Sequence, residues 1–401
     1  METLNSVLKT LFPFKGYKPS VRQNEGKILV QLKSRRKCGI CPSCGKRCRD
    51  VETVYTRTVR DLDLSRQECF LVIPEKKILC KCGYRGIEKL DFVSKSRRVT
   101  LRMEAYVVSL AEKMSLIDVA QTVRLDWKTV KEIDRDYIKT LLPDALQIKL
   151  RRIAIDEIAI MKGHKYCTII RDYDTGVVIK ICISRTYDEV KKALLDLGKE
   201  KLEQIRFVSL DMWDPYIKAL TELCPHAKLV FDKFHVVKKI NEALDSLRKS
   251  EFSKADPKER KMMKHRRFII LKRRENLEHE ERDKLRTIMK MNKRLYKSYL
   301  LKEQILSIFN DTVSTFEQIE KRLNTWFENV YNNCMNEFYG VVSMMKNHLY
   351  GILNYFRYGM TNAIAEGFNT KINIIKRRAY GFKDLEYFLL KIYQSSLRRF
   401  P

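Results

Sequence analysis

The chain contains no apolar run of 18 residues, which is about the shortest length that a membrane-spanning helix requires. Its first residues, METLNSVLKTLFPF, lack the basic stretch and apolar segment of a secretory signal. We therefore expect a cytoplasmic protein with no membrane partner, in which disulfide bonds are not expected. Acidic residues are outnumbered: the chain has 50 Asp and Glu against 80 Lys and Arg, a formal net charge of +30. This excess predicts a polyanionic partner, and nucleic acid is the obvious one.

Length and cysteine content add two further bounds. At 401 residues the chain is long enough for two or three domains, each with its own core. Hydrophobic residues make up 44% of the chain, which is ordinary for a globular protein. Seven of the 11 cysteines lie before residue 83. Clustered cysteines in a reducing compartment indicate a metal site.

Four N-terminal cysteines form two close pairs. Residues 38–48 read CGICPSCGKRC, in which Cys41 and Cys44 form a zinc-knuckle turn and the following glycine lets the backbone curl around the ion. The tripeptide CKC supplies Cys80 and Cys82, which would complete a tetrahedral site of four thiolates. We therefore expect one structural Zn²⁺.

The segment around these pairs leaves alternatives open. A one-residue gap between ligands is less common than a two-residue gap, so Cys38 and Cys48 are alternative ligands. Buried free thiols are the other interpretation, although this Lys-rich segment could hardly bury them. Between the pairs, Val51–Leu64 and Glu68–Leu79 alternate as strands of a small ribbon. Seven Lys and Arg residues within 33–49 have no acid among them, which indicates either phosphate contacts or a solvated face.

A helix-turn-helix pattern follows the ribbon. Apolar residues recur at helical spacing in Leu101–Lys113, Leu116–Val123 and Trp127–Ile138, and Asp126 is a suitable N-cap for the third helix. The last two helices would pack through Val119, Ala120, Val130 and Ile133. The third helix would then present four residues to a DNA groove: Lys128, Thr129, Lys131 and Arg135. Trihelical patterns also occur in proteins that bind no DNA.

From residue 149 the pattern changes to β-rich runs. We expect strands at Arg152–Ile160, Tyr166–Asp172, Val177–Ser184, Ile205–Leu210 and Lys228–Phe231, and helices at Tyr187–Leu197, Pro215–Leu223 and Phe234–Leu247. A tight turn at 174–176 would join the second and third strands as a hairpin. The order βββαβαβα describes a ribonuclease H-like sheet, in which the first and fourth strands are neighbours.

Three acidic residues stand out against this sheet. Asp156 lies in the first strand, Asp211 ends the fourth strand, and Glu366 lies in a helical segment, TNAIAEGFNTKIN. Brought together, the three carboxylates could hold two Mg²⁺ or Mn²⁺ ions that activate a hydroxyl and stabilise the leaving oxygen during phosphodiester displacement. Three rival carboxylates remain: Glu157, Asp172 and Asp232. Asp156 is preferred to Glu157 because neighbouring side chains of a strand point to opposite faces.

Two further residues could assist this site. His235, in DKFH, could reach the scissile phosphate or orient Asp232, and a satisfied structural histidine is the alternative. Trp213 lies two residues after Asp211 and could stack on an unpaired base near the cut. For Trp213, packing in the core is the favoured interpretation.

Strand signals stop after residue 236. Residues 236–300 carry 21 Lys or Arg against 10 Asp or Glu in a helical pattern, which predicts an all-helical insertion that clamps DNA or forms a solvated bundle. In the helix that carries Glu366, Asn373 and Arg377 share its polar stripe and are candidate DNA contacts. Such a stripe is weak evidence, because acidic starts and basic ends suit any helix dipole.

Four segments carry a resemblance to a known family: CPSCG, VSLDMWDPY, DKFHVVK and NAIAEGFNTKINIIKRRAYGF. They closely resemble bacterial insertion-sequence transposases of the ISL-three family, and the match runs over nearly the whole chain. The resemblance implies a DDE transposase with a ribonuclease H-like core and with Asp156, Asp211 and Glu366 as its triad. The CKC pair is shorter than the second half of the family's zinc motif.

The resulting expectation is a multidomain α+β protein. It has a zinc ribbon over 1–92, a helix-turn-helix domain over 93–148, a ribonuclease H-like core over 149–239 and 356–401, and a helical insertion over 240–355. It would bind the terminal inverted repeats of its element and cut and join double-stranded DNA as a homodimer or larger assembly, in the bacterial cytoplasm with the nucleoid. The alternatives are a structure-specific nuclease of the same fold and a non-catalytic DNA-binding regulator.

Overall fold

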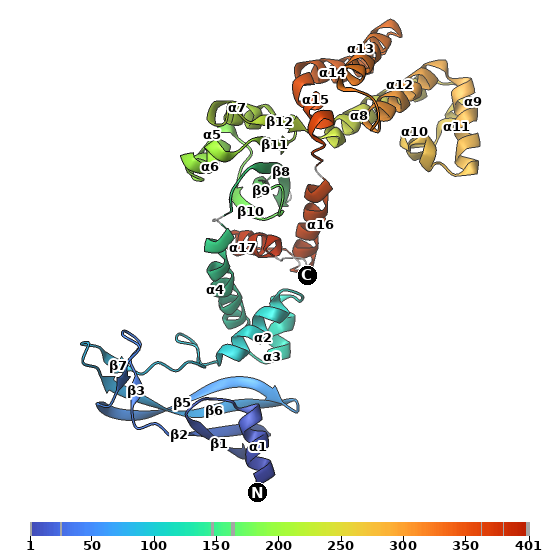
Figure 1. The fold of residues 1–401 in the computed structure, drawn as a ribbon. Helices are drawn as coiled ribbons and strands as arrows, with labels where there is room; N and C mark the ends of the chain where they lie inside the picture. The colour runs from blue at the N-terminus through green and yellow to red at the C-terminus, as the bar shows by residue number, and fades with distance from the viewer. Residues whose placement is uncertain are drawn as a thin grey trace. The chain divides into compact units, whose positions relative to one another are not determined.

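The computed structural model describes residues 2–24, 26–145, 148–161, 165–361, 363–379 and 381–397. The chain divides into two compact units: one holds Met1–Leu141 and Ile375–Leu390, and the other holds Leu142–Ile374 and Lys391–Pro401 (Figure 1). Among the described helices, none combines the length and the apolar character needed to cross a membrane.

The first unit begins with a helix and a twisted sheet of strands in the order β1-β2-β6-β5, with β7 added beside β6. The elements are α1 (Glu2–Leu11), β1 (Tyr17–Asn24), β2 (Lys27–Ser34), β5 (Val51–Leu64), β6 (Gln67–Leu79) and β7 (Arg85–Ile87). The expected strand pair is confirmed as the long antiparallel hairpin of β5 and β6. A small ribbon of β3 (Gly39–Ile40) and β4 (Arg47–Cys48) carries the first cysteine pair.

Three helices complete the N-terminal part of this unit: α2 (Leu101–Ala111), α3 (Leu116–Val123) and α4 (Trp127–Ala145). The expected cap is confirmed, because the Asp126 carboxylate accepts hydrogen bonds from the backbone N–H groups of Lys128 and Thr129. Val119, Val130 and Ile133 are buried in one apolar cluster, as the spacing predicts.

The second unit contains a five-stranded sheet with the order β10-β9-β8-β11-β12. Its strands are β8 (Arg152–Met161), β9 (Lys165–Asp172), β10 (Val178–Cys182), β11 (Phe207–Leu210) and β12 (Lys228–Phe231). The first three strands are antiparallel, whereas β8, β11 and β12 run parallel. The connections carry α5 (Tyr187–Leu195), α6 (Lys199–Gln204) and α7 (Asp214–Leu223). The predicted order of strands and the pairing of the first and fourth strands are therefore confirmed, whereas the short helix α6 was not predicted.

After β12 the described residues are helical, as expected. The helices are α8 (Lys233–Lys254), α9 (Pro257–Met263), α10 (Arg267–Leu271), α11 (His279–Met291), α12 (Lys293–Phe309), α13 (Phe316–Asn332), α14 (Asn336–Asn347), α15 (Leu349–Tyr358), α16 (Ala363–Arg378) and α17 (Leu385–Ser396). Gly351 brings α15 close to β12, since a Cβ at this position would lie 2.3 Å from the ring of Phe231. Asn354 adds a hydrogen bond of 2.8 Å to the carbonyl of Leu229.

Candidate active site and zinc site

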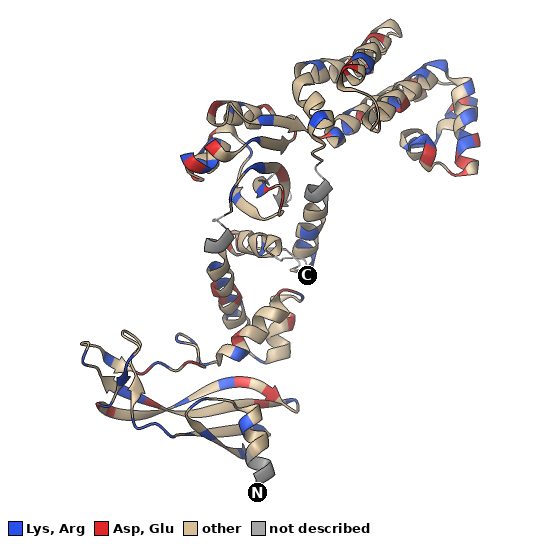
Figure 2. Cartoon of the chain, viewed as in Figure 1, with Lys and Arg blue, Asp and Glu red and all other residues tan. Residues whose placement is uncertain are grey.

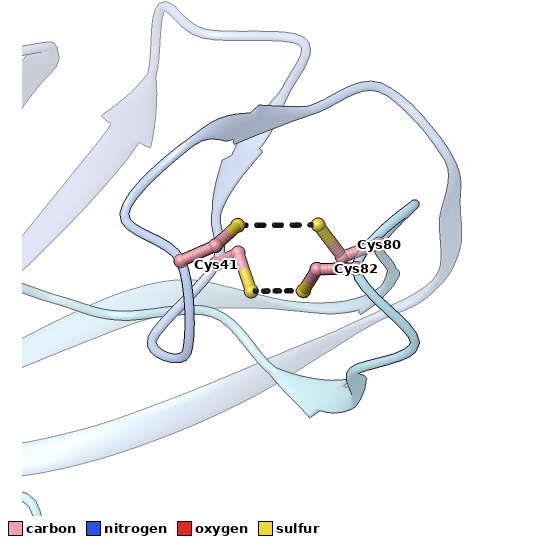
Figure 3. Close-up of side chains that lie close together, drawn as sticks. Cys41, Cys80 and Cys82 are labelled. Atoms are coloured by element: carbon pink, nitrogen blue, oxygen red, sulfur yellow. Dashed lines mark hydrogen bonds between the residues drawn. The ribbon is translucent and has the colours of Figure 1, made fainter.

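Four cysteine thiols converge at one point of the first unit (Figure 3). The Sγ atoms of Cys41 and Cys82 are 3.7 Å apart, those of Cys44 and Cys80 are also 3.7 Å apart, and all four lie within 4.8 Å of one another. Ligands at about 2.3 Å in a tetrahedron around Zn²⁺ would be about 3.8 Å apart. The cluster therefore fits a zinc ion without rearrangement.

Backbone turns hold these thiols in place. The amide of Gly45 donates to the carbonyl of Cys41, and the amide of Gly83 donates to the carbonyl of Cys80, each at 2.9 Å. Both glycines have positive φ, a conformation that other residues adopt at a cost. The backbone N–H of Tyr84, together with the thiol of Cys80, lowers the pKa of Cys82 to about 7, which favours the thiolate that binds metal.

The two alternative ligands lie outside this cluster. Cys48 is buried, and its thiol donates to the carbonyl of Leu79 at 2.7 Å. Cys38 is half-buried. The short CKC pair is thus the one that meets the CPSCG turn in the structure.

In the second unit, strand register places two of the predicted carboxylates side by side. Ser209 of β11 pairs in parallel with Ala154 of β8. Extending this register by two residues, just past the end of β11, brings Asp211 opposite Asp156. Asp156 is buried, and burial raises the pKa of its carboxyl group, with the charge of nearby Asp211 adding to the effect. Two adjacent carboxylates with this mutual repulsion are a donor set that a divalent cation would relieve.

Helix α16 supplies a direct contact to this pair. The side-chain amide of Asn369 donates to Oδ2 of Asp156 at 2.7 Å, and the backbone N–H of Glu157 donates to Oδ1. Glu366 lies near the start of α16, three residues before Asn369, and positions three apart fall on one face of a helix. The side chain of Glu366 lies outside the described part of the structure.

A buried arginine also links α16 to the sheet. The guanidinium of Arg171, on β9, lies 5.0 Å from the ring centroid of Phe368 and is nearly inaccessible to solvent. Burial lowers the pKa of Arg171, while the negative charge of Asp156 opposes that effect. Arg171 thus places a positive charge beside the carboxylate pair.

Each rival carboxylate has a different local partner. Glu157 lies 3.3 Å from Arg185, Asp172 accepts the amide of Thr175 at 2.8 Å, and Asp232 accepts the amide of Phe234 at the start of α8. The alternation along β8 thus separates Asp156 from Glu157, as expected.

His235 contacts Asp211, a partner that the sequence did not suggest. Nδ1 of His235 lies 3.2 Å from Oδ2 of Asp211, and this hydrogen bond raises the pKa of the imidazole. Of the carboxylates, the sequence offered only Asp232, which is nearer in the chain, as one of several possible partners of His235. The fold favours Asp211 because β11 and the start of α8 meet at the same edge of the sheet.

The core interpretation of Trp213 is wrong. The side chain is 39% exposed, and its ring lies 4.8 Å from the guanidinium of Arg185. Its Nε1 donates to the backbone carbonyl of Arg185 at 3.3 Å. An exposed tryptophan fixed in this way is available to a ligand.

The third helix of the helix-turn-helix differs from expectation at two positions. Lys131 and Arg135 are not free to face a groove, since each lies 2.7 Å from Oδ2 of Asp384 in the same unit. Lys128 is exposed and Thr129 is half-buried, both in the first turn of α4. The expected contacts of α16, Asn373 and Arg377, are exposed.

Some of the basic residues of the helical region are compensated by nearby acidic residues. Figure 2 shows Lys and Arg interspersed with Asp and Glu along α8 to α12. Asp245, on α8, is buried against three cations: Arg248 at 2.8 Å, Lys249 at 3.3 Å and Arg267 at 3.1 Å. Part of the basic excess is therefore structural.

Comparison with known proteins covers most of the chain. Residues 153–392 match a family model described as a transposase, residues 88–138 match the helix-turn-helix domain of transposase family ISL3, and residues 38–82 match the zinc-finger of transposase IS204/IS1001/IS1096/IS1165. The chain is 29% identical over 375 residues to the transposase for insertion sequence element IS1001 of Bordetella parapertussis, covering 92% of each protein. It is 28% identical to the transposase for insertion sequence element IS1557 of Mycobacterium tuberculosis, covering 87% of this chain and 83% of that one.

Proposed function

Because the chain belongs to the ISL-three (ISL3) family of transposases, we propose that it binds the terminal repeats of its own insertion sequence and cuts and joins DNA there. The observation that supports this most is the pair of carboxylates, Asp156 on β8 and Asp211 directly after the neighbouring parallel strand β11, with Asp156 bonded to the helix that carries Glu366. The strand order β10-β9-β8-β11-β12 supports a ribonuclease H-like core around them.

The three acidic residues would hold two Mg²⁺ or Mn²⁺ ions. Bound metal would activate the attacking hydroxyl and stabilise the leaving oxygen of an in-line displacement. The residues of the chain have separate tasks. Asp156 and Asp211 provide hard oxygen ligands, Asn369 fixes the orientation of Asp156, and His235 fixes that of Asp211.

DNA recognition would fall to the first unit and to α16. A structural Zn²⁺ held by Cys41, Cys44, Cys80 and Cys82 would organise the ribbon. The first turn of α4, with exposed Lys128 and half-buried Thr129, is the part of a recognition helix that usually reaches base edges. Asn373 and Arg377 would contact the double-stranded DNA from α16. The proposal includes domain boundaries after residues 92, 148, 239 and 355. It also includes assembly of the protein into a dimer or larger oligomer on DNA.

The test is a cleavage and joining reaction. Purified protein is incubated with Mg²⁺ and a duplex that carries the end of the element, and the products are mapped to the nucleotide. We expect a cut at the element end followed by joining of its 3′-hydroxyl to a second duplex. Cutting without joining would favour the structure-specific nuclease, and binding without cutting would favour the DNA-binding regulator.

A further inference from the structure

An exposed tryptophan lies at the edge of the proposed active site. The backbone N–H of Trp213 donates to the backbone carbonyl of Asp211 at 2.7 Å, so a tight turn of the main chain joins the two residues. The ring is 39% exposed, whereas Trp326 of the helical region is 1% exposed and packs in a core. This exposure excludes core packing as the main role of Trp213 and leaves part of its aromatic surface open to a ligand.

The ring belongs to a stack built from separate elements. The guanidinium of Arg185, between β10 and α5, lies 4.8 Å from the centroid of Trp213 and 4.7 Å from that of Tyr166 on β9. Glu157 of β8 lies 3.3 Å from the same guanidinium, and the indole N–H of Trp213 donates to the backbone carbonyl of Arg185. These contacts hold the indole of Trp213 and the guanidinium of Arg185 in place without covering them, since the side chain of Arg185 is still 41% exposed.

A rigid aromatic plane and a planar cation suit one kind of ligand in particular. Every nucleobase has a π-face that stacks on an aromatic ring, and a guanidinium can bind the adjoining phosphate. A base inside a duplex is already stacked on its neighbours, so only an unpaired base can use such a surface. The surface beside the carboxylates is therefore matched to DNA that is locally unpaired.

We propose that Trp213 and Arg185 form a platform that binds one unpaired nucleotide of the DNA, next to the phosphodiester that reacts. The base stacks on Trp213, and Arg185 contacts the backbone phosphate of that nucleotide, while Tyr166 and Glu157 hold Arg185 in place. Because stacking tolerates any base, the platform selects unpaired structure and not sequence. The inference rests on the proposed function, since the platform would serve the same reacting site.

The experiment uses the full chain and two matched probes. One probe is a duplex of the element end with a single unpaired 2-aminopurine at the cut, and the other has the same base paired. Ca²⁺ replaces Mg²⁺ to hold back cleavage. We expect the wild-type protein to quench the unpaired fluorophore and to bind that probe about tenfold more tightly than the paired one, as for one stacked base.

Four variants of the platform, one control variant and one fallback variant make the result specific. Trp213→Ala should lose both the quenching and the preference for the unpaired probe, whereas Trp213→Phe should keep most of each. Arg185→Ala should reduce the preference more than Arg185→Lys does, and binding of the paired duplex should change little throughout. Tyr296→Ala removes another exposed aromatic ring, on α12, and should behave as wild type. If Trp213→Ala does not fold, Trp213→Leu keeps apolar bulk without an aromatic face and decides in its place.

Two failures can be told apart. Quenching and preference that persist in Trp213→Ala or Trp213→Leu, while the wild-type protein cuts and joins DNA with Mg²⁺, would overturn the platform and leave the proposed function standing. A wild-type protein that shows no metal-dependent cutting would overturn the proposed function itself.

Discussion

Asn369 donates a hydrogen bond of 2.7 Å from its side-chain amide to Oδ2 of Asp156, across 213 residues of sequence. This bond joins α16 to β8 and brings the helix that carries Glu366 to the strand that carries Asp156. Burial raises the pKa of Asp156, and the hydrogen bond from Asn369 opposes this larger effect by lowering the pKa. Asn369 is thus a positioning residue for the proposed metal ligands.

Removing that hydrogen bond should weaken catalysis and leave DNA binding intact. For Asn369→Ala we expect a loss of about 10–100-fold in metal affinity or cleavage rate, the usual effect of losing a partner behind a metal ligand. The Mg²⁺ concentration for half-maximal cleavage should rise, and Asn369→Ser should restore part of the rate. A purely structural role would lower the melting temperature and leave the Mg²⁺ dependence unchanged.

Asn373→Ala is the matched control on the same helix. Asn373 lies one turn further along α16 and is exposed. Its loss should weaken DNA binding without shifting the Mg²⁺ dependence. An identical shift in both variants would contradict the positioning role of Asn369.

The third helix of the helix-turn-helix should divide into residues that bind DNA and residues that hold the fold. Lys128→Ala should weaken binding of the element end, because Lys128 is exposed in the first turn of α4. Lys131→Ala and Arg135→Ala should instead lower stability by up to about 1 kcal/mol each, because both side chains pair with Asp384. The measurements are fluorescence anisotropy and thermal melting. Loss of end binding in Lys131→Ala at unchanged stability would contradict this division.

The strands of the sheet and the positions of Asp156 and Asp211 were easier to predict from the sequence than the residues that contact these two carboxylates. Apolar runs ending in Asp211 and containing Asp156 identify two strands, and parallel pairing of β8 with β11 then brings the carboxylates together. Likewise, Cys41 and Cys44 are recognisable because their spacing alone determines their geometry. In both cases a short stretch of sequence is enough to identify the residues themselves.

Partners far apart in sequence could not be predicted in the same way. Asp384 reaches Lys131, and Arg185 reaches Trp213, only because separate elements pack together. For His235 the sequence suggested the scissile phosphate, Asp232 or a structural role, whereas in the structure its side chain contacts Asp211. Periodicity specifies which face of an element is polar, and it does not specify which distant charge meets that face.

The cluster around Asp245 gives a pH dependence. The pKa of Asp245 is held below its ordinary value: burial opposes this, and the hydrogen bond and charge of Arg248 outweigh it. A lowered folded-state pKa means that the contribution to stability is present above the unfolded pKa, near 3.8, and is lost as the pH falls through the folded value. Asp245→Asn should therefore lower the melting temperature at pH 7, and the difference from wild type should shrink below pH about 4.

The comparison with wild type at each pH removes effects common to both proteins, such as loss of zinc in acid. Glu280→Gln, which alters an exposed pair with Lys284 on α11, is the control and should change the melting temperature little. A difference for Asp245→Asn that grows on acidification would contradict the assigned direction.

Zinc removal should affect the first unit. Cys44→Ser should lose the single Zn²⁺, unfold the ribbon and abolish binding of the element end, because four thiolates replace a core that the ribbon is too small to form. Cys48→Ser is the control: Cys48 lies outside the cluster, so this variant protein should retain the zinc. Metal content by elemental analysis and limited proteolysis of the same samples measure both effects. A zinc-free wild-type protein with a protease-resistant ribbon would refute the site.

The central claim is that Asp156, Asp211 and Glu366 act together as one metal-dependent site, and cleavage by their amide variants tests it most directly. Asp156→Asn, Asp211→Asn and Glu366→Gln each keep the shape of the side chain and remove an anionic ligand. Each should bind the element end as wild type does and lose cleavage and joining by more than about 100-fold, beyond the effect of an outer partner. Asp172→Asn, a rival carboxylate whose partner is the turn residue Thr175, is the control and should keep most of the cleavage. Wild-type cleavage by any of the three amide variants, or a loss in Asp172→Asn as complete as in Asp156→Asn, would contradict the account.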